Sequence, residues 1–303
     1  MVNQFNKIIK QFILCVKSRR IVIVIYSWLS LIGLCIVYRG VPPLMLTVKL
    51  FFAMTGMALG TYLWNDVCDF TQDTFNEGIE PLAPSGRPLG RGLVSKRRMG
   101  IFSALLVILG LTASALININ VLLIQSAFLI IFFFYSTEPL RLKRIFLWKQ
   151  VTVAIGGAIA CLSAGLAAGT ITIQLLYLTG LFFLLTAGSH ALVDLRDIDS
   201  DRSDGVKTIP IVWGPRFTIR LALTTFTVAA ATTWIGFYGL GFNIALPIIG
   251  TFAFIAFVYM MYPLLGQLSD LEYREYSVKK LYTRGLPLYF VLQIAVLLGS
   301  LPL

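Results

Sequence analysis

The chain has 303 residues, a mean hydropathy of +0.83, 57% apolar residues and only 13% charged residues. Average soluble domains are about one quarter charged, so this composition excludes an ordinary soluble domain, a disordered chain and a disulfide scaffold. The net charge of +11 comes with no nucleic-acid-binding motif, and in a membrane protein such an excess reports topology. We therefore expect a polytopic membrane protein that binds no nucleic acid.

Nine stretches are apolar and long enough to cross a bilayer, which takes about 20 residues in a helix. In chain order they are Ile21–Val37, Leu44–Trp64, Met99–Ile117, Val121–Ser136, Val151–Ala168, Ile171–Val193, Phe217–Tyr238, Ile244–Leu265 and Leu286–Leu303. The sequence predicts an all-α protein in which residues 1–303 form a single membrane domain.

Basic residues alternate strongly between the segments outside these spans. Their numbers are 5, 1, 5, 0, 4, 0, 5, 0 and 4 in chain order, with Lys49 inside the second span. Because cytoplasmic loops collect Lys and Arg, this pattern places the N-terminus in the cytoplasm and the C-terminus outside. All 14 acidic residues fall in the basic-rich segments, so we expect the functional site on the cytoplasmic face.

Two acidic motifs of identical spacing, D-x-x-D-x-x-x-D, lie at the ends of the second and sixth spans. Each residue of the first is 128 positions before its counterpart in the second; the members are Asp66, Asp69 and Asp73, then Asp194, Asp197 and Asp201. This spacing places three carboxylates on one face of a helix. The repeat also predicts two four-helix pseudo-repeats, at about residues 21–136 and 151–265, followed by a ninth helix.

The carboxylates in these motifs repel one another, and they lie at the helix end where the macrodipole disfavours negative charge. A divalent cation offsets this cost, and Mg²⁺ is commonly bound by one or two carboxylates together with substrate phosphates. A solvated acidic loop is the alternative interpretation, but it does not explain two identical triplets. We interpret both motifs as metal ligands.

Cationic residues beside Pro or Gly accompany the motifs. They are Arg87, Lys143, Arg144 and Lys207. Arg presents a fork that matches phosphate oxygens, and Lys presents a compact charge. Carboxylates that hold Mg²⁺, surrounded by such cations, are typical of a diphosphate site.

Four parts of the chain together resemble the UbiA superfamily of intramembrane prenyltransferases: Asn65-Asp66-x-x-Asp69-x-x-x-Asp73, Arg87-Pro88-Leu89, the segment 135–144 and the second acidic motif. The resemblance covers nearly the whole chain. It implies a UbiA-like helical bundle around a central cavity and Mg²⁺-dependent ionisation of a polyprenyl diphosphate.

The resemblance also implies a role for each site residue. Two Mg²⁺ ions are expected, one on Asp66, Asp69 and Asp73 and one on Asp194, Asp197 and Asp201. The catalytic carboxylates are expected to be Asp66, Asp69, Asp194 and Asp197. The diphosphate is expected to contact Arg87, Lys143, Arg144, Lys207, Asn65 and Tyr135.

The function that follows is a prenyltransferase, a transferase of alkyl groups other than methyl, acting on a hydrophobic aromatic or lipid acceptor. A membrane terpene cyclase with the same diphosphate site is an alternative, and a cation-coupled transporter is a second. Transporters usually place their charges near the bilayer midplane, whereas these lie at the ends of spans. We expect a multi-pass protein of a prokaryotic plasma (inner) membrane, with its partners the lipid bilayer, a prenyl diphosphate and the acceptor.

Overall fold

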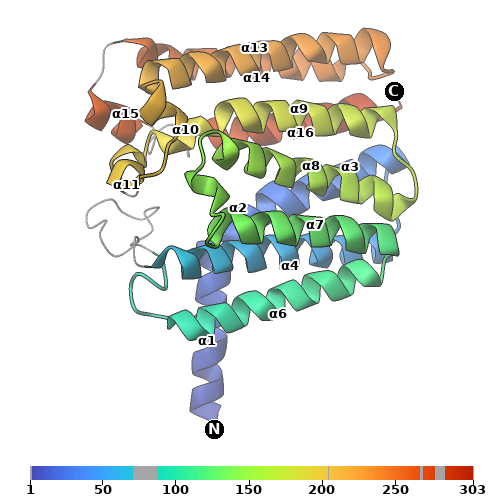
Figure 1. Ribbon diagram of the computed structural model, residues 1–303. Helices are drawn as coiled ribbons and strands as arrows, with labels where there is room; N and C mark the ends of the chain where they lie inside the picture. The colour runs from blue at the N-terminus through green and yellow to red at the C-terminus, as the bar shows by residue number, and fades with distance from the viewer. Residues whose placement is uncertain (1, 71–86, 204, 267–268, 277–283, 303) are drawn as a thin grey trace. The chain divides into compact units, whose positions relative to one another are not determined.

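The computed structural model describes residues 2–70, 87–203, 205–266, 269–276 and 284–302. Every regular element in these ranges is a helix, which confirms the all-α prediction (Figure 1). The chain divides into two compact units, one of Met1–Ser30 with Leu44–Leu142 and the other of Leu31–Pro43 with Lys143–Leu303. The predicted internal repeat of two four-helix halves stays a prediction.

The first unit contains one helix that runs crosswise to the others and a set of long apolar helices that lie side by side (Figure 1). Its elements are α1 (Val2–Ser18), α2 (Arg20–Val22), the π-helical turn η1 (Ile23–Ser27), α4 (Leu44–Cys68), α6 (Lys96–Ala115) and α7 (Ile119–Ser136). The helices α4, α6 and α7 pack against one another, and η1 packs against α4. The first span continues from η1 into α3 (Trp28–Tyr38).

The second unit is built around four long helices with short helices at the end that carries the second acidic motif. The long ones are α8 (Trp148–Ala168), α9 (Ile173–Ser189), α13 (Pro215–Gly239) and α14 (Ala245–Met261). The short ones are η3 (Leu142–Arg144), α10 (Ala191–Asp194), α11 (Ile198–Ser203), α12 (Ile209–Val212), η4 (Tyr262–Leu265) and α15 (Asp270–Tyr276), and α16 (Leu286–Ser300) follows. The contacts run from α8 to α9, from α9 to α13, and from α14 to both α13 and α16.

Within the described residues, eight helices are long and apolar enough to cross a membrane, and they match the first eight predicted spans to within a few residues. The ninth predicted span is shorter than expected, since α16 has 15 residues. At 1.5 Å per residue it extends over about 22 Å, less than the roughly 30 Å of a hydrocarbon core. The chain is a multi-pass membrane protein.

Large apolar side chains lie exposed in stripes along the long helices. On α14 the stripe contains Phe252, Ile255 and Tyr259, and on α6 it contains Ile101, Leu105 and Ile108. In water such patches would be unusual for a monomer, whereas a bilayer surrounds them with acyl chains. These faces are therefore the lipid-facing surfaces of the two helices.

The helices begin and end where the sequence supplies the required chemistry. The Asn118 side chain caps α7 by accepting a hydrogen bond of 2.9 Å from the amide of Val121. Gly169 ends α8 in the left-handed conformation, with a φ of 78°. Pro215 occupies the first turn of α13, where the missing N–H costs nothing.

Close backbone contact joins α4 to α6 at two glycines. A Cβ atom on Gly56 would lie 2.6 Å from the carbonyl oxygen of Leu106 and 2.7 Å from the amide nitrogen of Gly110. Small residues at such crossings allow helices in membranes to approach closely. This contact holds α4, which carries Asp66 of the first acidic motif, close against α6.

We expect Gly56→Ala to lower the stability of the protein by about 1–3 kcal/mol, because the added methyl group must push two backbones apart. The matched control is Gly100→Ala on α6, where a Cβ would meet no atom within 4 Å. Alanine favours the helix over glycine, so the control should melt at the same or a higher temperature. Thermal unfolding in detergent measures both, and equal Tm values for the two variants would contradict the close packing.

Candidate functional site

The first acidic motif begins at the last turns of α4, where Asp66 is fully buried. Two arginines from distant parts of the chain bind its carboxylate. Arg19 donates from Nε to Oδ2 over 3.0 Å and from Nη2 to Oδ1, and Arg87 donates from Nη1 to Oδ1 over 2.7 Å. A carboxylate that forms ion pairs with two guanidinium groups remains charged in an apolar bundle, because the ion pairs offset its lost hydration.

Asp69 follows one helical turn later and is also buried. Its Oδ1 accepts from Arg141 Nη2 over 3.1 Å, and its Oδ2 accepts from Asn65 Nδ2 over 3.0 Å. The Asn65 Oδ1 atom in turn accepts from the hydroxyl of Ser136 over 2.8 Å, which ties α4 to the end of α7. Asn65 is thus a positioning residue for the motif in this structure.

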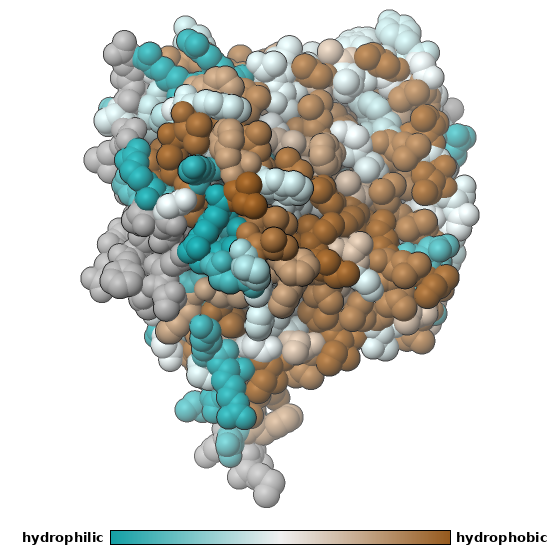
Figure 2. Space-filling model, in the orientation of Figure 1, coloured by the Kyte–Doolittle hydropathy of each residue, from teal (hydrophilic) through white to brown (hydrophobic). Residues whose placement is uncertain are grey.

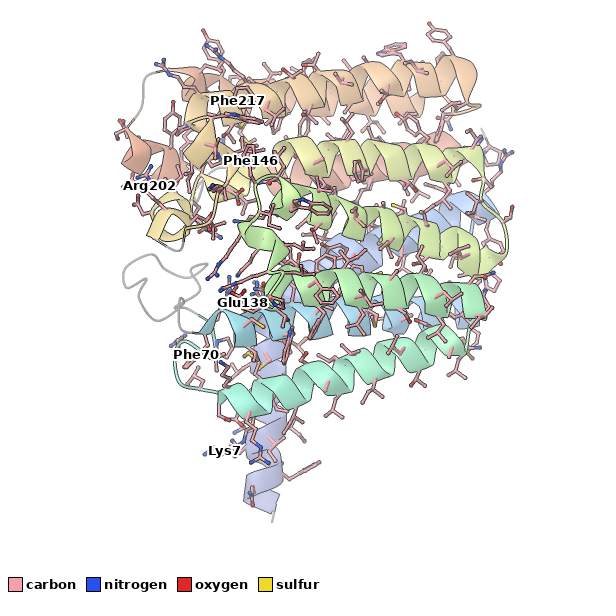
Figure 3. The ribbon with its side chains drawn as sticks, in the orientation of Figure 1. Lys7, Phe70, Glu138, Phe146, Arg202 and Phe217 are labelled. Carbon is pink, nitrogen blue, oxygen red and sulfur yellow. The ribbon has the colours of Figure 1, made fainter. Side chains whose placement is uncertain are left out.

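The backbone at Arg141 is strained, with a φ of 33° in the left-handed region that non-glycine residues rarely adopt. Such strain persists where surrounding contacts impose it, often at functional sites. Here the Asp69 carboxylate holds the guanidinium, and Glu138 contributes a second, longer ion pair of 3.5 Å. Figure 3 shows Glu138 at the same end of the first unit as Phe70, the residue after Asp69.

Aromatic rings lie next to the Asp66 site. The guanidinium of Arg19 stands 5.6 Å from the ring centroid of Tyr62, and the Tyr62 and Tyr26 hydroxyls are 3.2 Å apart. Phe132 packs against both tyrosines and also against Tyr135, with each centroid distance close to 6 Å. These rings form an aromatic wall beside the Asp66 ion pairs, and aromatic faces attract cations.

The third carboxylate of the first motif, Asp73, lies outside the described residues, within the segment 71–86. Among the residues that the structure describes, no group of three or more Asp, Glu, His or Cys side chains forms a ready metal-binding cluster. The donor chemistry nevertheless fits Mg²⁺. Asp66 and Asp69 offer hard oxygen ligands, and Mg²⁺ characteristically takes one or two carboxylates plus phosphate oxygens and water.

The second acidic motif begins with Asp194, the last residue of α10, which is fully buried like Asp66. A single lysine serves two of its carboxylates. The ammonium of Lys149, at the start of α8, lies 2.8 Å from Asp194 Oδ1 and 3.1 Å from Asp201 Oδ2. The neighbouring Gln150 donates from Nε2 to Asp194 Oδ2 over 2.7 Å. Two adjacent residues of α8 thus hold the motif.

The pKa of Asp201 is raised to about 6, chiefly by burial and also by the carboxylates of Asp194 and Asp197, against the lowering effect of the Lys149 charge. Asp197 has a different partner, because Arg196 donates to both of its oxygens over 2.6 Å. The three carboxylates of this motif are therefore unequal, and Asp194 and Asp201 share one positive charge.

Other predicted site residues lie in looser surroundings. Lys143 and Arg144 form η3, where Arg144 is exposed and Lys143 is half-buried, and Lys207 is exposed before α12. Tyr135 is half-buried near the end of α7, against Phe132. The structure thus ties Arg87 and Asn65 directly to the first motif, while the diphosphate contacts expected for all six residues stay predictions.

Comparison with known proteins decides the family. The model of the UbiA prenyltransferase family matches residues 26–275. The chain belongs to the UbiA prenyltransferase family. The resemblance expected from the two acidic motifs is thereby confirmed.

Several relatives of this UbiA-family protein have known names. A digeranylgeranylglyceryl phosphate synthase of Sulfurisphaera tokodaii is 27% identical over 261 residues, which are 84% of this chain and 87% of the relative. A second, from Sulfolobus acidocaldarius, is 29% identical over 78% of this chain and 81% of its own. The bacteriochlorophyll synthase 33 kDa chain of Cereibacter sphaeroides is 33% identical over 54% of this chain and 53% of its own.

Solved structures share the fold of this UbiA-family protein. A structure of digeranylgeranylglyceryl phosphate synthase has a TM-score of 0.70 and 20% identity, and covers 98% of this chain and 99% of its own. A UbiA homologue of Archaeoglobus fulgidus, solved with GPP and Mg²⁺, has a TM-score of 0.66 and 18% identity over 94% of this chain and 99% of its own. These likenesses establish a UbiA-like fold.

Sequence reasoning missed four residues that hold the motif carboxylates: Arg19, Arg141, Lys149 and Gln150. Counting basic residues for topology treated Arg19 and Lys149 as ordinary positive-inside charges. Their position carried the missing signal, since Arg19 immediately precedes the first span and Lys149 opens the fifth. Consecutive spans run in opposite directions, so a cation at the start of one span lies on the same side of the membrane as a carboxylate at the end of the next.

We expect Lys149→Met to lower the stability of the metal-free protein by about 3–5 kcal/mol, because it leaves the Asp194 carboxylate buried without its charge partner. Lys207→Met is the matched control, since this lysine is exposed and should cost little. Both are compared by thermal unfolding in detergent with a chelator present. A Lys149→Met protein as stable as the control would show that the bridge contributes nothing.

Proposed function

We propose that the protein is a Mg²⁺-dependent intramembrane prenyltransferase that ionises a polyprenyl diphosphate and transfers the prenyl group to a lipid or aromatic acceptor. The observation that best supports this proposal is the arrangement around Asp66, a fully buried carboxylate that is bound by Arg19 and Arg87 beside a wall of aromatic rings. Family membership and the names of the relatives support the same activity.

We assign Mg²⁺ binding to Asp66, Asp69 and Asp73 in the first motif and to Asp194, Asp197 and Asp201 in the second, with one ion for each motif. The chemistry that bound Mg²⁺ supplies is neutralisation of the diphosphate charge, which makes the diphosphate a better leaving group. Carboxylate oxygens are hard ligands, and Mg²⁺ commonly takes one or two of them together with substrate phosphates.

The basic residues bind and orient the diphosphate. Arg19 and Arg87, which bind Asp66, present guanidinium forks that match phosphate oxygens, and Arg141 presents a third fork beside Asp69. We also assign diphosphate binding to Lys143, Arg144 and Lys207. As the allylic C–O bond breaks, the leaving oxygen gains charge, and these fixed cations stabilise that charge without reorganising.

The aromatic wall protects the carbocation that remains. The π faces of Tyr26, Tyr62, Phe132 and Tyr135 attract positive charge and exclude water, which would otherwise capture the cation. A nucleophilic atom of the acceptor then forms the new bond to the prenyl carbon and loses its proton. Two relatives are named for a glyceryl phosphate lipid and one for bacteriochlorophyll, which supports a lipid or ring acceptor.

The direct test is diphosphate release from geranylgeranyl diphosphate, and from shorter and longer analogues, by the purified protein with and without Mg²⁺. We expect release to require Mg²⁺ and to fall by about 10²-fold or more in Asp66→Asn and in Asp194→Asn, the magnitude typical of a lost electrostatic contact. Asp199→Asn is the matched control, because Asp199 lies within the second motif but is exposed and out of register. It should retain full activity.

Product analysis with lipid and phenolic acceptors then separates the alternatives. Product that forms only with an acceptor identifies a transferase, whereas a hydrocarbon or terpene alcohol formed without one identifies a cyclase. Failure to release diphosphate with any chain length or acceptor, from protein that melts cooperatively, would refute the proposal and make cation flux the next assay.

Arg19 provides a sharper test of the site, because the residue after it is also an arginine. We expect Arg19→Gln to lower kcat/KM for the prenyl diphosphate by about 10–100-fold, the value of a charge-assisted hydrogen bond. Arg20 is exposed, so Arg20→Gln should leave kcat/KM unchanged. Steady-state kinetics measure kcat/KM for both variants. An equal loss of kcat/KM in Arg19→Gln and Arg20→Gln would mean that Arg19 acts only through general positive charge.

A further inference from the structure

The N-terminal helix α1 has two chemically distinct sides. At 100° per residue, its apolar side chains fall on one face and its lysines on the other. The apolar face contains Phe5, Ile8, Ile9, Phe12, Ile13 and Val16, and the opposite face contains Lys7, Lys10 and Lys17. Leu14 is the exception, since it lies among the lysines.

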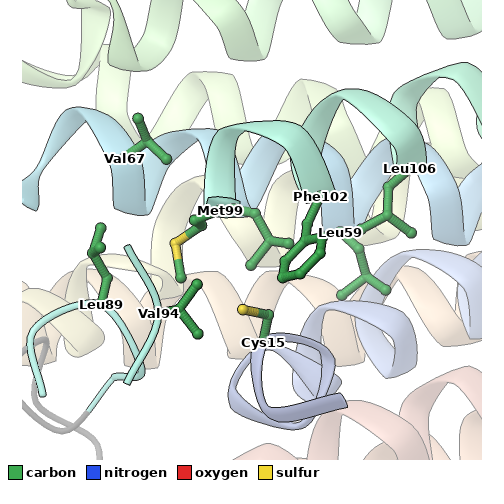
Figure 4. Close-up of a cluster of buried hydrophobic side chains, with 9 residues drawn as sticks. Cys15, Leu59, Val67, Leu89, Val94, Met99, Phe102 and Leu106 are labelled. Atoms are coloured by element: carbon green, nitrogen blue, oxygen red, sulfur yellow. The ribbon is translucent and has the colours of Figure 1, made fainter. Parts of the chain in front are cut away.

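The C-terminal half of α1 is fixed to the rest of the first unit. Cys15 is fully buried in a cluster with Leu59 and Phe102 (Figure 4), and burial raises the pKa of its thiol to about 12. Gln11 donates to the carbonyl oxygen of Leu93 over 2.7 Å and accepts from Arg98 over 2.7 Å. These contacts set the direction in which α1 leaves the unit.

That direction is crosswise to α4 and α6, close to the ends that carry the acidic motif and Lys96 (Figure 1). The projecting part is teal on one side and brown on the other in Figure 2, and Lys7 lies on it in Figure 3. The brown side faces the direction in which α4 and α6 extend from the motif end. Phe5 is 64% exposed and Ile13 is 44% exposed, so apolar surface remains uncovered there.

The charge of this segment has a single sign. The chain contains no acidic residue before Asp66, and α1 has three exposed lysines followed by Arg20 at the start of the first span. Since Arg19 alone separates α1 from that span, the C-terminal end of α1 lies next to the start of the first span. A helix that is apolar on one side and basic on the other, at this position, has the properties of an interfacial membrane helix.

We propose that α1 lies in the plane of the membrane surface at the motif end of the bundle, where it binds anionic phospholipids. The exposed part of its apolar face, with Phe5, Ile9 and Ile13, inserts at the boundary between headgroups and acyl chains, while Phe12 and Val16 of the same face pack against the first unit. Lys7, Lys10 and Lys17 contact the headgroups. Lysines near an anionic surface each contribute about a fivefold gain in affinity. A second copy of the chain would cover the apolar face equally well, but it would not explain the row of lysines along the helix.

Site-directed spin labels on the full-length protein in vesicles test this placement. Cys35 and Cys68 are replaced by Ala so that they do not take up label, whereas Cys15 and Cys161 are kept because both are fully buried. Ile9→Cys and Leu14→Cys form a matched pair, since both native side chains are about 40% exposed but lie on opposite faces of α1. We expect the label at position 9 to be more accessible to oxygen than to a water-soluble nickel chelate. The label at position 14 should be more accessible to the nickel chelate.

Lipid charge provides the second arm of the experiment. We expect phosphatidylglycerol in phosphatidylcholine vesicles to increase the immersion of the label at position 9. Replacing Lys7, Lys10 and Lys17 together by Gln should abolish that increase. Equal accessibility at positions 9 and 14 would overturn the proposal, and so would insensitivity to phosphatidylglycerol. Spin–spin broadening between labels at position 9 would instead assign the face to a second copy. None of these outcomes depends on enzymatic activity.

Discussion

Carboxylates that are buried at the ends of membrane helices must be compensated by nearby cations, and this requirement shapes the surroundings of each acidic motif. Asp66 and Asp194 are each fully buried, where an uncompensated charge would cost several kcal/mol. The compensation comes from Arg19 and Arg87 in one unit and from Lys149 in the other. The junction after α1, the turn at Arg87 and the start of α8 are therefore held where these ion pairs require them.

The two motifs share their spacing but not their electrostatics. Guanidinium forks from separate segments bind the first motif, and each fork is directional and always charged. In the second motif one ammonium lies between two carboxylates, and burial raises the pKa of Asp201 to about 6. Identical spacing therefore does not make the motifs equivalent, because the partners come from different helices and loops.

The sequence was sufficient to predict the helical class and eight of the spans, since length and hydropathy determine these features. The prediction that the second triplet lies on one face of a helix was wrong, because Asp194 ends α10, Asp197 lies in a bend and Asp201 lies in α11. It did not reveal Arg19 and Lys149 as partners, because a count of basic residues treats all loop cations alike. Pairing across more than 40 residues depends on which helix ends meet, as for Arg19 with Asp66. The strained backbone at Arg141 likewise comes from tertiary contact, since nothing local in the sequence demands a positive φ there.

On the proposed function, the ion pairs seen here have a second consequence. The cations that compensate Asp66 and Asp69 are already desolvated and oriented, so a diphosphate that binds them need not pay again for ordering those side chains. Preorganised charge of this kind stabilises a developing anion more than flexible surface charge does, because nothing moves as the C–O bond breaks. Aromatic rings beside the same ion pairs keep the surroundings of low polarity, which strengthens each of these interactions. The same buried charges that make the motif costly to fold are therefore the ones best suited to ionise a prenyl diphosphate.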